Sequence, residues 1–227
     1  MTATYILVHG GWAGAWCWRD VATEFDHRGV TWRAVDLPSS RRSADARTGL
    51  VEDTAAVAAL ADGDGPYVLV AHSYGGAVVS EVAARIPNLQ RCIYVAALIP
   101  SPGESAYDAS QRVHIRTLMD EAIEVDGGHL RLRPDAAIAA FFSDCTPEVA
   151  KWAGDQLSTQ TLASFRSRRE SHNASTETIY VRCMNDHAID PQIQQLMSEE
   201  CDFALSLESE HYPLLSQPAG FCDAILN

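Results

Sequence analysis

The chain has 227 residues, of which 47% are hydrophobic and 21% are charged, and this composition is typical of a globular protein rather than a disordered or fibrous one. Seventeen Lys and Arg residues stand against thirty Asp and Glu residues, which gives a formal net charge of −13 at pH 7. We therefore expect no nucleic-acid partner, because binding a phosphate backbone requires a basic surface.

Membrane and secreted classes are also disfavoured. No apolar run approaches the roughly 20 residues that a membrane-spanning helix needs, and residues 1–8 lack the basic start and cleavage site of a signal peptide. The six cysteines are scattered without a C-x-x-C pair, which favours reduced, buried thiols over a disulfide framework or a zinc site. We expect a cytoplasmic protein with no membrane partner.

Short apolar runs alternate with helical segments along most of the chain. The runs are rich in Val, Ile, Tyr and Leu and cover residues 5–8, 30–35, 67–71, 92–98, 178–183 and 203–207. Helices are predicted over residues 18–27, 50–61, 76–85 and 191–200 and from Pro218 to the C-terminus. This order predicts one α/β domain over residues 1–227, with about six mainly parallel strands and helices on both faces of the sheet.

Residues 101–173 interrupt this alternation. They contain no strand-like run, their large apolar residues recur with helical periodicity, and Gly127-Gly128 and several prolines divide them. We expect a helical cap over the sheet, since an insertion of this length is usually functional. Four aromatic residues of the cap are candidates for substrate binding and for a preference for bulky hydrophobic or aromatic acyl groups: Phe141, Phe142, Trp152 and Phe165.

The segment 67–76 carries the most informative motif. A buried strand leads into Ala71-His-Ser-Tyr-Gly-Gly76 and then into a helix, which is the context of the G-x-S-x-G nucleophile elbow with alanine at the first glycine. In this motif a sharp turn between strand and helix lifts the serine oxygen above the sheet. The sequence therefore predicts Ser73 as a nucleophile.

A serine nucleophile needs a histidine base, and the histidine needs a carboxylate to orient it. On this topology the chain order is serine, acid, histidine. His211, in the loop before the last helix, is the candidate base, and Asp186, just after the strand at 178–183, is the candidate acid. The alternatives for the acid are Asp190 and, less plausibly, Glu208 or Glu210.

Acyl transfer also needs backbone N–H groups that stabilise the oxyanion. Tyr74, which follows the nucleophile, supplies one candidate, and the glycine-bearing turn after the first strand supplies Gly11, with Trp12 as the neighbouring alternative. Trp12 is also a candidate for lining an aromatic substrate pocket. His9 and His72 sit where strands enter their turns, so we interpret them as supports for the backbone rather than as bases.

Together, residues 5–18, residues 67–76 and the His211 segment resemble the α/β-hydrolase superfamily, and more narrowly its branch of plant-type methyl esterases, hydroxynitrile lyases and bacterial esterase relatives. The resemblance spans nearly the whole chain. It implies Ser73, Asp186 and His211 as nucleophile, acid and base, Gly11 and Tyr74 as oxyanion donors, and residues 101–173 as a cap over the acyl pocket. It implies no metal and no cofactor. The oligomeric state stays open, with a homodimer as one option.

Within this branch, hydroxynitrile lyases resemble one another in a threonine at the position of Gly10 and a lysine directly after the catalytic histidine, where this chain has Tyr212. Relatives with carboxylate nucleophiles, such as dehalogenases, differ at Ser73. The resemblance therefore implies a serine hydrolase that cleaves an ester, thioester or lactone of a small hydrophobic or aromatic molecule through an acyl-enzyme. A lyase that breaks C–C bonds and a protein that only binds a small molecule are the alternatives.

Overall fold

A parallel sheet forms the centre of the computed structural model, which describes residues 2–172 and 175–226. Its six strands lie in the order β2-β1-β3-β4-β8-β9, and every neighbouring pair is parallel. The strands are β1 (Thr4–Val8), β2 (Thr31–Ala34), β3 (Tyr67–His72), β4 (Leu89–Val95), β8 (Glu177–Cys183) and β9 (Phe203–Leu207). All residues of β3 are buried, which explains its unbroken apolar sequence. The predicted α/β class is confirmed.

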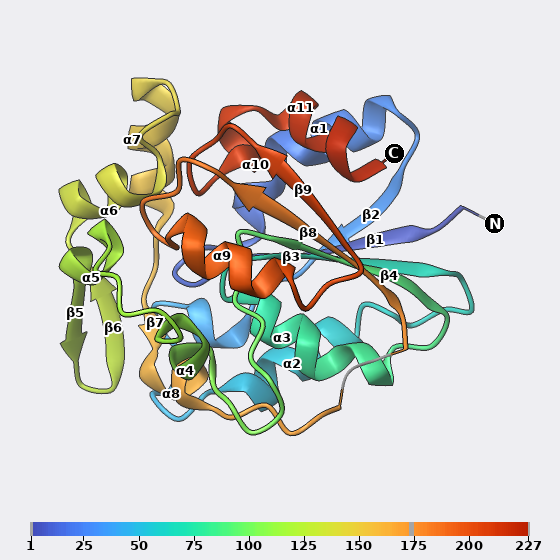
Figure 1. The fold of residues 1–227 in the computed structure, drawn as a ribbon, viewed down its shortest axis with the longest axis horizontal. Coiled ribbons are helices and arrows are strands. Elements are labelled where there is room, and N and C mark those ends of the chain that lie inside the picture. The colour runs from blue at the N-terminus through green and yellow to red at the C-terminus, as the bar shows by residue number, and fades with distance from the viewer. Residues whose placement is uncertain (1, 173–174, 227) are drawn as a thin grey trace.

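Helices cover both faces of this sheet. Helices α1 (Arg19–His27) and α11 (Pro218–Leu226) pack together on one face, and α2 (Leu50–Ala58) and α3 (Gly75–Val82) pack together on the other (Figure 1). Helix α9 (Pro191–Ser198) packs against β8. Shorter helical turns lie in the connections: η1 (Ala15–Trp18), η2 (Pro38–Ser40), η3 (Ala83–Arg85) and α10 (Pro213–Ser216).

The segment between β4 and β8 lies beyond the carboxyl ends of the strands, at the left of Figure 1. We call its described residues, 101–172, the cap; the end expected at residue 173 lies outside the described residues. Its elements are α4 (Ala106–Ser110), α5 (Leu118–Ala122), β5 (Ile123–Asp126), β6 (His129–Leu132), α6 (Pro134–Phe141), α7 (Pro147–Gln156), β7 (Gln160–Thr161) and α8 (Leu162–Arg166).

The cap contains five helices, as the expectation of a helical cap requires, but the expectation that it holds no strand is wrong. The cap contains a three-stranded antiparallel sheet in the order β5-β6-β7, and Ile123, one of the large apolar residues whose spacing suggested a helix, begins β5. Gly127 and Gly128 form the turn of a hairpin rather than a boundary between helices, and both have positive φ, 55° and 83°. A Gly-Gly pair suits such a two-residue hairpin turn, and residues 123–126 and 129–132 alternate apolar and polar side chains on either side of it, a hairpin signal that the expectation of helix overlooked.

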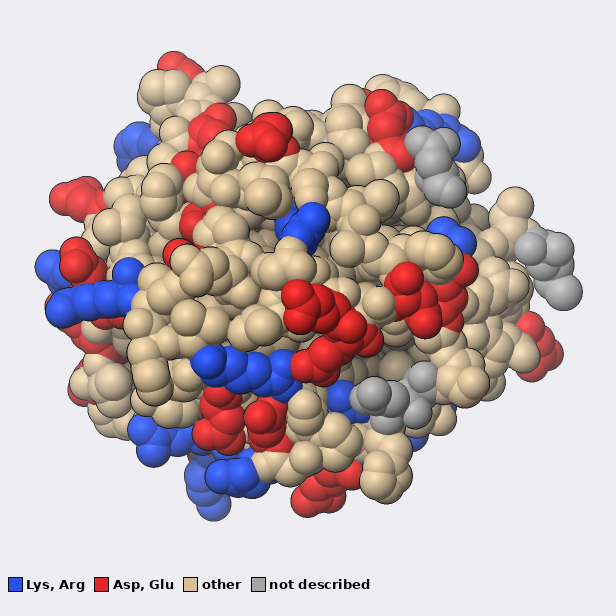
Figure 2. All heavy atoms as spheres, in the orientation of Figure 1, with Lys and Arg blue, Asp and Glu red and all other residues tan. Residues whose placement is uncertain are grey.

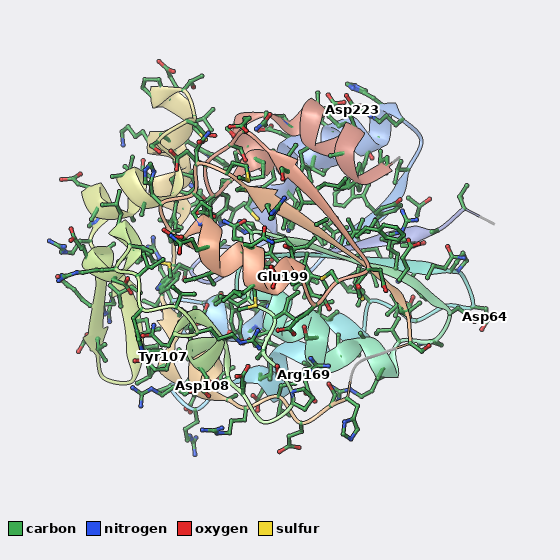
Figure 3. All side chains as sticks on the ribbon, viewed as in Figure 1. Asp64, Tyr107, Asp108, Arg169, Glu199 and Asp223 are labelled. Carbon is green, nitrogen blue, oxygen red and sulfur yellow. The ribbon has the colours of Figure 1, made fainter. Side chains whose placement is uncertain are left out.

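The two ends of the cap leave the body of the protein side by side. The amide of Gly103 donates to the carbonyl of Arg169 at 2.7 Å, and the amide of Arg169 donates to the carbonyl of Glu104 at 2.8 Å. Figure 3 shows Asp108 of α4 and Arg169 on the same side of the molecule, near this junction. The chain therefore enters and leaves the cap through two adjacent segments that are hydrogen-bonded to each other.

Two surface features bear on partners. No helix in the described part of the chain is long and apolar enough to cross a membrane. On the face shown in Figure 2, acidic and basic side chains interleave, so this face carries no continuous basic stripe for a phosphate backbone.

Candidate active site

Ser73 occupies a sharp turn between β3 and α3. Its φ is 54°, a left-handed conformation that a residue with a side chain adopts rarely. The amide of Ser73 donates to the carbonyl of Val95 at 3.1 Å, and its carbonyl accepts from the amide of Leu98 at 3.1 Å. The strained turn is thus fixed on both sides to the end of β4, as a nucleophile elbow requires.

The two glycines after this turn are needed for close packing. A Cβ atom on Gly75 would lie 2.7 Å from the carbonyl oxygens of both Val8 and His9, and one on Gly76 would lie 2.5 Å from the carbonyl oxygen of Leu98. Helix α3 therefore begins in direct contact with the main chain beyond β1 and β4. Any larger residue would push the helix, and with it the turn at Ser73, out of place.

The predicted acid and base are hydrogen-bonded to each other. Oδ2 of Asp186 lies 2.7 Å from Nδ1 of His211, and the two residues are 4% and 1% exposed. Asp186 also accepts from the amides of Ala188 and Ile189 at 2.7 and 2.9 Å and from Nε2 of Gln194 at 2.9 Å. Three donors other than His211 therefore fix the orientation of this carboxylate toward His211.

The alternative acids have other partners. Asp190 caps α9 by accepting from the amide of Gln192 at 2.8 Å, and Glu210 lies 2.8 Å from Nδ1 of His187. Glu208 is exposed. Of the four candidate carboxylates in the described residues, Asp186 is the one that hydrogen-bonds to the predicted base.

The two buried histidines near the turn support the backbone, so the interpretation of His9 and His72 is confirmed. Nε2 of His72 donates to the carbonyl of His211 at 2.8 Å, which ties the loop of the predicted base to β3. Nε2 of His9 accepts from the amide of Leu37 at 3.0 Å, and its Nδ1 donates to the carbonyl of Gly10 at 2.7 Å. Burial lowers the pKa of His9 to about 4 and the pKa of His72 well below 6.5, so neither is charged near pH 7.

The loop after β1, residues 9–14, packs directly on the predicted nucleophile. A Cβ atom on Gly10 would lie 2.7 Å from Cβ of Ser73 and 3.0 Å from Nδ1 of His72. The absence of a side chain at Gly10 is thus what lets the main chain of this loop approach the serine. We call residues 9–14 the oxyanion loop.

The structure separates the two candidate donors in this loop. The amide of Trp12 donates to Oε1 of Gln160 at 3.2 Å and is therefore occupied. Within residues 2–172 and 175–226, the amides of Gly11 and Tyr74 donate to no protein acceptor. Two unpaired amides beside a serine are suited to stabilising an oxyanion, and the alternative donor Trp12 is not.

Three of the five predicted pocket residues contact one another around the site. The ring of Phe141 stacks on the ring of His211 with centroids 5.4 Å apart, and the ring of Phe165 stacks on Tyr74 at 5.1 Å. Trp12 lies 5.5 Å from Phe165 and 6.2 Å from Phe141. The cap therefore brings aromatic surface to the predicted base and to the residue after the nucleophile.

Of the other two predicted pocket residues, Phe142 contacts Phe141 edge-on at 5.9 Å, whereas Trp152 lies apart from this cluster. Phe142 packs on Tyr212, with ring centroids 4.8 Å apart. Trp152 packs edge-on against Trp16 at 5.3 Å, and the guanidinium of Arg19 lies 3.7 Å from its ring centroid. Trp152 therefore joins α7 to the body at a seam beside α1, and its ring contacts there are with neither Trp12 nor the other three predicted aromatic residues.

A buried polar network that the sequence analysis missed joins the turn at Ser73 to the cap. Asp53, which is fully buried, accepts from the amide of Ser39 at 3.0 Å and from the hydroxyl of Tyr74 at 2.7 Å. Ser39 also donates its hydroxyl to Asp53 and accepts from Nε2 of Gln160 at 2.8 Å. Burial raises the pKa of Asp53. An aspartate in the first turn of a helix and a glutamine in a short strand give no signal in sequence that they meet.

Two cavities lie away from the predicted nucleophile, acid and base. The larger, about 610 Å³, has a wall at the amino-terminal ends of β8 and β9, including Thr178 and Phe203. The smaller, about 260 Å³, is lined by His9, Gly14 and the cap residue Ser158. Ser73, Asp186 and His211 line neither. Among the described residues, no group of three or more His, Cys, Asp or Glu side chains is placed to hold a metal ion.

A parallel sheet with a serine at the strand-to-helix turn, and an Asp-His pair at the ends of later strands, defines an α/β hydrolase. The model of the alpha/beta hydrolase family matches residues 5–224, and the chain belongs to this family. The predicted superfamily is thereby confirmed.

Individual relatives narrow the branch. The chain is 28% identical over 250 residues to methylesterase 7 of Arabidopsis thaliana, an alignment that covers 98% of this chain and 94% of the relative. It is 34% identical over 120 residues to a carbendazim hydrolyzing esterase of a Nocardioides species, which covers 45% of each chain. The predicted branch, with its plant methyl esterases, agrees with these relatives.

Solved structures show the same fold over the full length. Polyneuridine aldehyde esterase superposes with a TM-score of 0.85 at 20% identity, covering 100% of this chain and 98% of the other. A pyrethroid hydrolase from Sphingobium faniae superposes with a TM-score of 0.83 at 23% identity, covering 100% and 96%. At these identities the likeness establishes the fold.

Proposed function

We propose that this protein is a serine hydrolase that cleaves a carboxylic ester of a small hydrophobic or aromatic molecule through an acyl-enzyme intermediate. The observation that carries the proposal is the 2.7 Å hydrogen bond between Asp186 and His211. The main chain of His211 is in turn tied to His72, the residue before Ser73. The relatives named methylesterase 7 and carbendazim hydrolyzing esterase support ester hydrolysis.

In the proposed reaction, Oγ of Ser73 attacks the ester carbonyl while Nε2 of His211 takes its proton. Nδ1 of His211 faces Asp186 at 2.7 Å, so Nε2 is the nitrogen left for the serine. His211 then gives this proton to the leaving alcohol. A water molecule, activated by the same histidine, hydrolyses the acyl-enzyme and restores Ser73.

Negative charge develops on the carbonyl oxygen at both tetrahedral stages. The amides of Gly11 and Tyr74 are the proposed oxyanion donors, because both are unpaired in the described structure, Tyr74 directly follows the nucleophile, and Gly11 directly follows Gly10, which packs on the nucleophile. Each such donor is typically worth roughly 10²- to 10³-fold in rate. The buried surroundings increase this effect by excluding water.

The acyl group is proposed to lie against the aromatic residues of the cap. Phe141 and Phe165 supply apolar surface beside His211 and Tyr74, and Trp12 lies between them. Such a lining favours bulky hydrophobic or aromatic acyl groups over acetyl, because apolar surface is removed from water on binding. Methyl esters are the first class to assay, given the named relatives.

The lyase alternative is not favoured. A threonine in place of Gly10 would begin with a Cβ atom only 2.7 Å from Cβ of Ser73, so the loop as it stands has no room for the side chain that lyases of this branch carry. Tyr212, which follows His211, is buried and bears no positive charge to hold a leaving cyanide.

A substrate panel compared with Ser73→Ala tests the proposal. Esters, thioesters and lactones with small and bulky acyl groups are assayed on both proteins, and cyanide release from a cyanohydrin is measured in parallel. We expect ester turnover by the wild type and a loss on the order of 10⁴ or more in Ser73→Ala. Retention of more than about a tenth of the activity in the variant would exclude this mechanism.

A fluorophosphonate that reacts with activated serines separates an enzyme from a protein that only binds. We expect the probe to label the wild type at Ser73 and to leave Ser73→Ala unlabelled. Labelling with neither turnover nor a burst on any ester would favour a binding function.

A further inference from the structure

Trp12, next to the proposed oxyanion donor Gly11, is held in a strained conformation. Its φ is 59°, in the left-handed region, where a bulky residue costs roughly 1–3 kcal/mol. Such a conformation persists only where the surroundings enforce it. The surroundings of Trp12 therefore determine where the main chain of the oxyanion loop lies.

All of the hydrogen-bonding groups of Trp12 are used by the cap. Its amide donates to Oε1 of Gln160 at 3.2 Å, its carbonyl accepts from the amide of Ser158 at 2.7 Å, and its indole Nε1 donates to the carbonyl of Leu130 at 2.9 Å. The three partners come from β6, from the connection after α7 and from β7. The body of the protein holds the start of this loop through the hydrogen bond between Leu37 and His9. The cap holds the strained residue Trp12.

Gln160 also connects this loop to the second proposed donor. Its Nε2 donates to Ser39 at 2.8 Å and to Ser164, and its Oε1 also accepts from the hydroxyl of Ser40. Ser39 continues the network to Asp53 and so to the Tyr74 hydroxyl. Every polar atom of the fully buried Gln160 side chain is thus paired. Gln160 of the cap therefore connects Trp12, which follows the proposed donor Gly11, to the side chain of the second proposed donor, Tyr74.

We propose that the cap assembles the oxyanion hole, with Gln160 and Trp12 as positioning residues that hold the Gly11 amide toward the substrate carbonyl. This inference rests on the proposed function. A cap that shifts away from the sheet removes the partners of Trp12, the strained main chain relaxes, and the Gly11 amide leaves the position of the oxyanion. Hydrolysis is then fast only while the cap is packed on the sheet, and it is slow whenever the cap has moved away.

The test is Gln160→Met, which keeps the length of the side chain but removes both of its polar groups. We expect kcat to fall roughly 10- to 100-fold with KM within about threefold of wild type, because the lost contact acts on the transition state. A trifluoromethyl ketone, which forms a tetrahedral adduct with the serine, should bind more weakly by the same factor. A purely structural role would lower thermal stability without this matched loss.

Gln156→Met is the matched control, since Gln156 is an exposed glutamine at the end of α7. It should keep wild-type kcat and ketone affinity. If Gln160→Met does not fold, Trp12→Phe carries the test, because it retains an aromatic ring but loses the hydrogen bond to Leu130 and part of the indole's packing. We expect it to lose roughly three- to tenfold in kcat and in ketone affinity alike.

The outcomes separate this inference from the proposed function. A folded Gln160→Met, or failing that a folded Trp12→Phe, with wild-type kcat and ketone affinity would overturn the inference while leaving the hydrolase intact. A wild type that neither hydrolyses any ester nor reacts with the fluorophosphonate would overturn the proposed function, and with it the inference.

Discussion

The two halves of the candidate site are held by different parts of the molecule. Asp186 and His211 lie in loops after β8 and β9, and the side chain that supports them, Gln194, comes from α9. These elements all belong to the body. On the other side, Trp12 of the oxyanion loop takes its hydrogen bonds from the cap.

This difference separates a half whose orienting hydrogen bonds come from the body from a half whose orienting hydrogen bonds come from the cap, although the cap also contacts the first half through Phe141 on His211. The proton-transfer half is fixed by a parallel sheet, whose strands align the loops at their carboxyl ends. The oxyanion half needs the cap, whose covalent links to the body are its two paired ends. Substitutions in the two halves should therefore differ in the size and kind of their effects, and four predictions test this.

The largest effect is expected for the body-held half. Asp186→Asn should fold and yet lose on the order of 10⁴ in kcat, because an amide at this position stabilises the wrong tautomer of His211. Steady-state kinetics with the best ester, together with circular dichroism to verify folding, measure this. A variant with more than about a tenth of wild-type kcat would show that Asp186 is not the acid.

Asp190→Asn is the matched control, four residues further along the same loop. Asp190 caps α9 and has no bond to His211, and asparagine caps a helix about as well as aspartate. We expect kcat near that of the wild type and a change in unfolding free energy below about 1 kcal/mol. An inactive Asp190 variant would move the acid to this residue.

The body-held start of the oxyanion loop should make the protein sensitive to acid. Burial lowers the pKa of His9 to about 4, against 6.5 in the unfolded chain, so stability is full above pH 6.5 and is lost as the pH falls toward 4. The shift corresponds to at most about 3 kcal/mol. The lowered pKa of His72 acts in the same direction.

Urea unfolding at pH 7 and pH 4.5 measures this loss. We expect His9→Asn to lose about 2–3 kcal/mol less than the wild type between these pH values, whatever its stability at pH 7. The exposed His27 lacks the burial of His9, so His27→Asn is the control and should keep the wild-type difference. An unchanged pH dependence in His9→Asn would show that protonation of this ring does not cause the loss of stability at low pH.

Close contact between the oxyanion loop and Ser73 predicts a smaller but specific loss. Gly10→Ala adds a Cβ atom 2.7 Å from Cβ of Ser73, so either the loop or the serine must shift. A displacement near 1 Å in the site is expected to cost about 100-fold in kcat/KM. Gly65→Ala, where a Cβ atom meets nothing within 4 Å, should leave kcat/KM unchanged. Equal kinetics for the two variants would contradict the contact.

The body was predictable because its signals are local. Each strand is a short apolar run between turn residues, and the motif at Ser73 combines a strand, a turn and a helix within ten positions. Chain order then pointed to Asp186 and His211, and Asp186 lies three residues beyond the end of its strand. These inferences needed no knowledge of which distant segments meet.

The hairpin of β5 and β6 has a local signal, an alternation of apolar and polar residues on both sides of Gly127-Gly128, and the helical interpretation of this segment overlooked it. The pairing of β6 with the two-residue strand β7 and the polar network depend on distant contacts, and so they could not be predicted. Gln160 meets Trp12 across 148 positions of sequence, and Asp53 meets Tyr74 across 21. A polar residue buried by such contacts looks in sequence like one on a solvated surface.

The smallest expected effect concerns acyl selectivity, and it compares cap residues with one another. Phe141 stacks on His211 and Phe165 stacks on Tyr74, whereas Trp152 packs between Trp16 and Arg19 at the seam with α1. If the first two contact the acyl group, truncating either to alanine should change the ratio of kcat/KM for a bulky and a small ester by roughly 10-fold. Trp152→Ala removes as much aromatic surface from the cap without touching those rings, so it should lower both values equally or not at all. The decisive measurement is this ratio in the three folded variants, because a loosened cap slows both esters while a lost pocket contact penalises the bulky one. Should Phe141→Ala and Phe165→Ala leave the ratio unchanged, these rings would hold the cap in place and the acyl group would have to be bound elsewhere.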